Sequence, residues 1–179
     1  MASLKDLMEE KIHHRDLKIS TYKAKDKCII IEGQLIDNSL IETHHYSGKM
    51  RPAKTIHHMI IRLLIDSKLT IREVEVEMPA FPHEECPETQ ASLNDVIGMK
   101  ISRGFTMKIK EMFSGGRGCS HLAELIISMA PAAVQGYWTA FTSEPLPNNL
   151  QDTMRLMLSD TCWVWRKDGP ALKRVAESV

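Results

Sequence analysis

The chain has 179 residues, of which 43% are hydrophobic, and this length and apolar content fit a single folded domain over residues 1–179. Its 23 basic and 23 acidic side chains cancel, so no overall field attracts nucleic acid or an anionic membrane surface. The charged N-terminus has no apolar signal core, and no apolar run approaches the roughly 20 residues that span a bilayer. The sequence therefore predicts a cytoplasmic protein that binds neither nucleic acid nor membrane. It leaves a protein partner and the oligomeric state open.

The chain begins with the pattern of a short polar helix followed by a hairpin. Residues 4–13 predict the helix. The runs LKISTY at 17–22 and CIIIEGQLID at 28–37 have the alternation and β-branched content of two strands, with a turn between them at 24–27. Asp37 and the asparagine after it end the second strand, and a polar loop follows.

Two further strands complete the first half of the chain. Residues 56–65 predict a strand whose more apolar face carries His57 together with the odd-numbered apolar residues. In the next run, 69–78, the apolar positions change from odd to even numbers. A bulge near Arg72 and Glu73 would restore one apolar face, because one extra residue shifts a period-two pattern by one. The first half therefore predicts a four-stranded antiparallel meander.

The second half has helical patterns interrupted by glycine and proline. The longest predicted helix starts near Cys119 and carries an inward stripe of Leu122, Leu125, Ile126 and Met129. Pro131 kinks this helix or divides it. The other helices are predicted at 88–98, 104–113 and 150–158 and after Gly169.

The order of these elements predicts the fold class. Strands gather in a strand-rich part, 14–78, and helices in a helix-rich part, 84–179, without alternating. This separation is typical of α+β proteins, in which helices pack on one face of an antiparallel sheet.

The segment GGRGCSHLAEL, at 115–125, is the first candidate site. A cysteine at a helix N-terminus lies among unpaired N–H groups at the positive end of the helix dipole, which favours the thiolate as nucleophile or metal ligand. Cys119 is therefore the predicted reactive thiol. Arg117 and Gly118, within the glycine-rich turn, indicate a weaker alternative, an anion-binding site.

Other metal-ligand residues stand singly along the chain. The four cysteines include no CxxC pair, which favours free thiols over a disulfide framework. Cys86 follows Glu85 just before a predicted helix. Thiolate, imidazole and carboxylate together suit zinc or iron, so His57, Cys86 and Cys119 form a candidate ligand set. His57 fits a core histidine equally well, and His121 also fits a helix cap.

A set of short segments carries a resemblance to a known family. IEGQLID, HHM, LTIREVEV, ECPE, VIG and GGRGCSHLAEL occur in this order and spacing. Over about residues 14–140 the chain resembles an uncharacterised bacterial family, domain of unknown function 2889, in which G-C-[ST]-H-L is the most specific element. The resemblance implies a class of protein and no particular activity.

The strand, strand, cysteine, helix order is also similar to that of NifU-type iron–sulfur cluster scaffolds. That resemblance implies a NifU-like core, with Cys86 at the middle cysteine of the scaffolds, Cys119 at the last and His57 at the position of an aspartate. Thr55 stands at the first cysteine and Gly118 at a histidine, so the resemblance implies a mononuclear zinc or iron site in place of a cluster. The fourth ligand would be His121 or Glu85.

Three function classes follow from these residues. The first is a metal-binding protein, such as a metal or cofactor assembly factor with one zinc or iron ion. The second is a thiol-dependent enzyme with Cys119 as nucleophile and His57 or His121 as base. The third is a non-catalytic interaction module with structural cysteines.

Overall fold

The computed structural model describes residues 3–45, 47–141 and 158–177. Contacts divide the chain into two compact units, Met1–Ala140 and Phe141–Val179, which are described separately. The single domain expected over residues 1–179 stays a prediction. The α+β class is confirmed, because the first unit contains an antiparallel sheet followed by helices.

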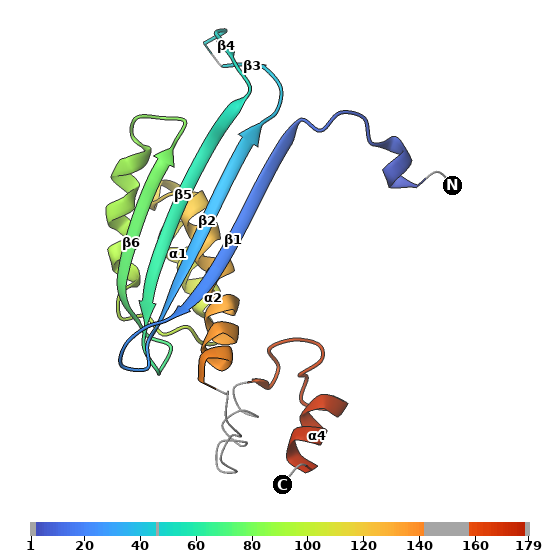
Figure 1. The fold of residues 1–179 in the computed structure, drawn as a ribbon, viewed down its shortest axis with the longest axis vertical. Helices are drawn as coiled ribbons and strands as arrows, with labels where there is room; N and C mark the ends of the chain where they lie inside the picture. The colour runs from blue at the N-terminus through green and yellow to red at the C-terminus, as the bar shows by residue number, and fades with distance from the viewer. Residues whose placement is uncertain (1–2, 46, 142–157, 178–179) are drawn as a thin grey trace. The chain divides into compact units, whose positions relative to one another are not determined.

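The sheet of the first unit has four antiparallel strands in the order β1-β2-β5-β6 (Figure 1). This is the predicted meander. The strands are β1 (His13–Lys23), β2 (Ile29–Ser39), β5 (Lys54–Ile65) and β6 (Ile71–Ala80). The polar loop between β2 and β5 contains a small hairpin, formed by β3 (Thr43–His44) and β4 (Met50–Arg51).

The N-terminal boundary differs from the prediction of a helix over 4–13. Only Leu4–Leu7 is helical, as the short 3₁₀ helix η1, and β1 already begins at His13. The polar start of β1 is a strand because its backbone pairs with the far end of β2, where His13 lies opposite Ser39. Pairing with a neighbouring strand overrides the weak helical pattern.

The predicted bulge in the last strand is confirmed. Leu64 pairs with Glu73 and Ile65 with Ile71, so Arg72 is the extra residue. The bulge keeps Ile71 on the buried face while Glu73 turns to solvent.

The helices largely follow their predicted ranges. They are η2 (Cys86–Val96, a 3₁₀ helix), α1 (Phe105–Phe113), η3 (Gly115–Arg117), α2 (Ser120–Phe141) and α4 (Pro170–Glu177). Division at Pro131 is wrong, since α2 runs through this residue, with buried Ala130 and Ala133 on either side. The helix predicted at 150–158 lies outside the described residues, apart from Leu158. Among the described residues, no helix combines the length and apolar character needed to cross a membrane.

Helices α1 and α2 cover one face of the sheet (Figure 1). The predicted stripe of α2 is fully buried there. Gly33 of β2 lets α2 approach closely, because a Cβ at this position would lie 2.6 Å from Met129 Sδ. The sheet contributes the odd-numbered residues of its two central strands, all at most 1% exposed: Ile29, Ile31, Leu35, Met59, Ile61, Leu63 and Ile65. The same face ends at Asp37 and His57, where polar groups replace the apolar ones.

Candidate metal centre

A row of polar residues crosses one end of the sheet on its helix-covered face. Arg15 of β1 pairs with Asp37 of β2, and Asp37 pairs with His57 of β5. Side chains that lie opposite one another in an antiparallel sheet share a face. The odd parity that buries Leu35 and Met59 therefore also turns Asp37 and His57 toward α2.

Asp37 is the buried centre of this row, with its side chain only 3% exposed. Its two oxygens accept hydrogen bonds from Arg15 Nε at 2.6 Å and Arg15 Nη2 at 2.7 Å. These bonds from the Arg15 guanidinium hold the pKa of Asp37 below its usual range, despite burial. Asp37 is therefore a carboxylate at neutral pH. A third arginine nitrogen, Nη1, donates to Glu124 of α2 at 2.7 Å.

Two histidines from different elements face the same oxygen of Asp37. His57 Nδ1 is 3.0 Å from Asp37 Oδ2, and His121 Nε2 is 4.0 Å from that atom. Their rings lie side by side, with centroids 3.9 Å apart and planes inclined by 33°. His121 reaches this position because it belongs to the first turn of α2, which lies over the end of the sheet.

These three side chains form a group that fits one metal ion. Within the described residues, Asp37, His57 and His121 are the one group of three or more His, Cys, Asp or Glu side chains whose ligand atoms all lie within 4.8 Å of one another. Atoms bound to one ion at about 2.0–2.2 Å lie at most about 4.4 Å apart. The two distances to Asp37 Oδ2 satisfy this limit already. Two imidazoles and one carboxylate suit zinc or iron.

Burial prepares both histidines to act as ligands. Loss of solvent lowers the pKa of His57 below its ordinary value, which outweighs the opposing effect of Asp37. Burial also lowers the pKa of His121, and the neighbouring His57 lowers it further. Metals bind the neutral imidazole, so these environments favour the form that coordinates.

Cys119 lies next to this group, as its place before α2 predicts. Its Sγ is 3.9 Å from His121 Nδ1, the ring nitrogen that faces away from Asp37. The thiol thus contacts a ligand-type side chain without joining the group around Asp37. His13 lies near the other oxygen of Asp37, with its Nε2 3.4 Å from Asp37 Oδ1.

The other residues predicted for this site are not members of the group around Asp37. Cys86 begins η2 and Glu85 precedes it, and neither belongs to the group of ligand atoms around Asp37. Their role as ligands stays a prediction. Arg117 donates to the side chain of Ser114 at 2.5 Å, and Gly118 packs against Phe113. The anion site at Arg117 and Gly118 likewise stays a prediction.

The predicted ligand set did not include Asp37, although the sequence pattern indicated that this residue is buried. Asp37 continues the buried parity of Ile31, Gly33 and Leu35, and a carboxylate on an apolar face must find a partner. Asp37 was interpreted as the end of the strand and not as a buried strand residue, but β2 continues to Ser39.

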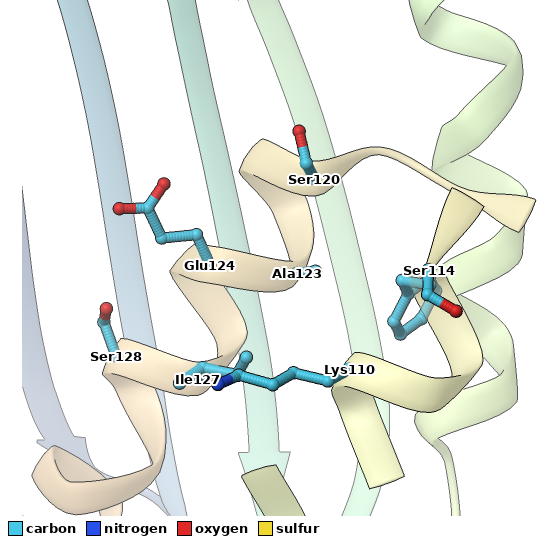
Figure 2. A pocket seen from close by; sticks show the side chains of 8 residues that line it. Lys110, Ser114, Ser120, Ala123, Glu124, Ile127 and Ser128 are labelled. Carbon is cyan, nitrogen blue, oxygen red and sulfur yellow. The ribbon is translucent and has the colours of Figure 1, made fainter. Parts of the chain in front are cut away.

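A groove of about 440 Å³ lies beside the site, between α1 and α2 (Figure 2). Ala123 and Ile127 of α2 line it, and Lys110 extends from α1 toward Ile127. Glu124 also lines the groove while its carboxylate holds Arg15. The groove is therefore connected to Asp37 through two ion pairs.

Comparison with known proteins gives a family for this chain. No curated protein and no solved structure matches it. The resemblance to NifU-type scaffolds accordingly stays a prediction. One family model matches residues 13–135, which is more than half of the chain and includes the polar row, His121 and Cys119. The chain therefore belongs to the family described as Protein of unknown function (DUF2889).

Proposed function

We propose that this protein binds a single zinc or iron ion through Asp37, His57 and His121. The observation that carries the proposal is the convergence of these ligand atoms from β2, β5 and α2 on one small volume. Residues 37, 57 and 121 are far apart in the chain, so the fold itself builds the group. Partial burial, an anionic carboxylate and neutral imidazoles are the conditions that favour coordination.

Arg15 supports this function by orienting the carboxylate. A ligand carboxylate is commonly held by hydrogen bonds from residues that do not touch the metal. Here Arg15 contacts both Asp37 oxygens and is itself anchored by Glu124. Each Asp37 oxygen has more than one lone pair, so Oδ2 can accept the Arg15 hydrogen bond and still bind an ion.

Three protein ligands suit a protein that passes its metal on. Structural zinc sites usually have four protein ligands, whereas a site with three keeps a position at which an acceptor's ligand can enter. The His121 side chain is 27% exposed, which gives that ligand a route to the ion. We therefore favour metal delivery or cofactor assembly as the cellular use of the site.

Metal content tests the proposal. Untagged protein purified without oxygen or chelator is expected to hold close to one equivalent of zinc or iron. His57→Ala and His121→Ala should each lose more than about tenfold in affinity, because even outer partners of metal ligands contribute about 10–100-fold. Elemental analysis and competitive zinc titration measure both quantities.

His14→Gln is the matched control, since His14 contacts only exposed Asp16 among the ion pairs of its strand. It should bind metal like the wild type. Wild-type protein that contains no metal and takes up none on titration would overturn the proposal.

A thiol-dependent enzyme is the second candidate, favoured by the line of atoms from Cys119 through His121 to Asp37. His121 Nδ1 faces the Cys119 sulfur and Nε2 faces the Asp37 carboxylate. This order of thiol, imidazole and carboxylate is the arrangement in which an imidazole removes the thiol proton while the carboxylate orients it.

Alkylation of metal-free protein tests this second function. Cys119 is expected to react with iodoacetamide faster than Cys28, and His121→Gln should slow it by about 10²-fold if the imidazole acts as a general base. Peptide mass spectrometry resolves the two sites, and the Cys28 rate in the same variant is the control. Equal Cys119 rates in wild type and variant would exclude the imidazole as base.

A further inference from the structure

We infer that the ion at Asp37, His57 and His121 takes a small carboxylate anion as an additional ligand, and that Arg15 binds the same anion. This inference rests on the proposed function.

The protein supplies fewer ligands than zinc or iron accepts. Zinc takes four or five and iron up to six, while the group offers Asp37, His57 and His121. The side chains of His57 and His121 are 14% and 27% exposed, so the remaining positions are reachable from solvent. An exogenous ligand can therefore reach the ion without unfolding the site.

The local charge favours a negative ligand. Asp37 and Glu124 are carboxylates, and Arg15 pairs with both of them. These three residues leave one net negative charge, which a divalent ion converts to one net positive charge. Charge in a partly buried site is poorly screened, so a neutral ligand such as water leaves this excess uncompensated. A monoanion compensates it.

Arg15 has the donors to hold such an anion beside the metal. A guanidinium carries five N–H groups, and the contacts to Asp37 and Glu124 use three of them. Nη1 and Nη2 each keep one N–H, and the Arg15 side chain is 32% exposed. Since Nη2 lies 2.7 Å from Asp37 Oδ2, an anion on the ion would be close to it. A planar carboxylate matches the guanidinium best, with one oxygen on the metal and the other on Arg15.

Cobalt-substituted protein tests the inference, because the visible spectrum of Co(II) reports its ligands. Acetate is expected to change the wild-type spectrum saturably. Arg15→Gln should weaken acetate binding by about tenfold or more, the usual contribution of hydrogen bonds to a charged group. Arg15→Lys keeps the positive charge but lacks the planar N–H donors of the guanidinium, so it should weaken acetate binding less. Inorganic phosphate should bind more weakly than acetate.

Arg62→Gln is the matched control. Arg62 pairs with Glu32 and Glu77 in a comparable ion cluster, and the alternation of β5 places it on the other face of the sheet. Its replacement should leave acetate binding unchanged. Circular dichroism checks that each variant is folded, and Arg15→Lys carries the test if Arg15→Gln is not.

The outcomes distinguish the metal site from its additional carboxylate ligand. Failure of the wild type to bind Co(II) would overturn the proposed function itself. Co(II) binding without a saturable response to acetate would overturn the carboxylate inference and leave the metal site standing. An equal loss in the Arg15 and Arg62 variants would overturn the role of Arg15, because it would reflect overall charge. Tighter binding of phosphate than of acetate would overturn the assignment to carboxylates.

Discussion

Asp37→Asn is expected to lower the free energy of unfolding of the metal-free protein by about 2–3 kcal/mol and to abolish tight metal binding. The carboxylate accepts two hydrogen bonds from Arg15, and hydrogen bonds to charged groups contribute about 1.5–3 kcal/mol. An asparagine presents its NH₂ group to one of the arginine donors and carries no charge, which leaves the more exposed Glu124 as the anionic partner of Arg15. Breaking one side of a buried pair is costly for this reason.

Urea unfolding after chelator treatment measures the stability, and competitive zinc titration measures the affinity. Asp16→Asn is the control, since Asp16 follows Arg15 on β1 but is exposed and contacts only His14 among the ion pairs. Surface pairs of this kind contribute little, so its effect should stay within about 0.5 kcal/mol. Equal effects of the two substitutions would contradict the central position of Asp37.

The sheet was predictable because its residues obey one strong rule. Alternation defined both faces of β2 and β5, and the change of parity between Ile71 and Val74 required the bulge that the structure places at Arg72. The N-terminal boundary depended on a contact with a distant strand. A polar run such as the one that begins at His13 carries little intrinsic preference, so pairing with β2 decided its structure.

The candidate site was only half predictable. His57 could be placed on the buried face from parity, and the segment around Cys119 could be placed at a helix start. Which partners they meet depends on how α2 lies across the sheet. No local pattern encodes that arrangement, and it brings His121 rather than Cys86 to His57.

The partner of Arg15 was also not predictable from a local pattern. Its pairing with Asp37 follows from the register of a hairpin, and register is fixed by the turn and by the buried side chains of both strands. The sequence predicted the hairpin. The predicted turn at 24–27 would set Lys23 opposite Cys28 and Arg15 opposite Ile36. The observed register sets Lys23 opposite Ile29 and Arg15 opposite Asp37, so the hairpin pattern alone did not give the buried ion pair.

The pH dependence of zinc affinity should identify the ligands directly. Each neutral imidazole that binds zinc must first lose its proton, so affinity falls by up to about tenfold per pH unit for each histidine below its pKa. Burial lowers the pKa of both His57 and His121 below 6.5. The ligands are therefore already neutral above that value. Affinity should stay level above about pH 6.5 and fall only at lower pH, by up to about 100-fold per unit once both imidazoles are protonated.

Thiolate ligands would give a different dependence of zinc affinity on pH. A free thiol loses its proton near pH 8.5, so a site built from such thiols would bind zinc more tightly as the pH rises from about 7 to 8.5. Asp37 contributes no slope in this range, because Arg15 holds its pKa low. A competition titration between about pH 5 and 8.5 separates the cases. A level affinity above about pH 6.5 supports the Asp37, His57 and His121 site, whereas a continuing rise would contradict it.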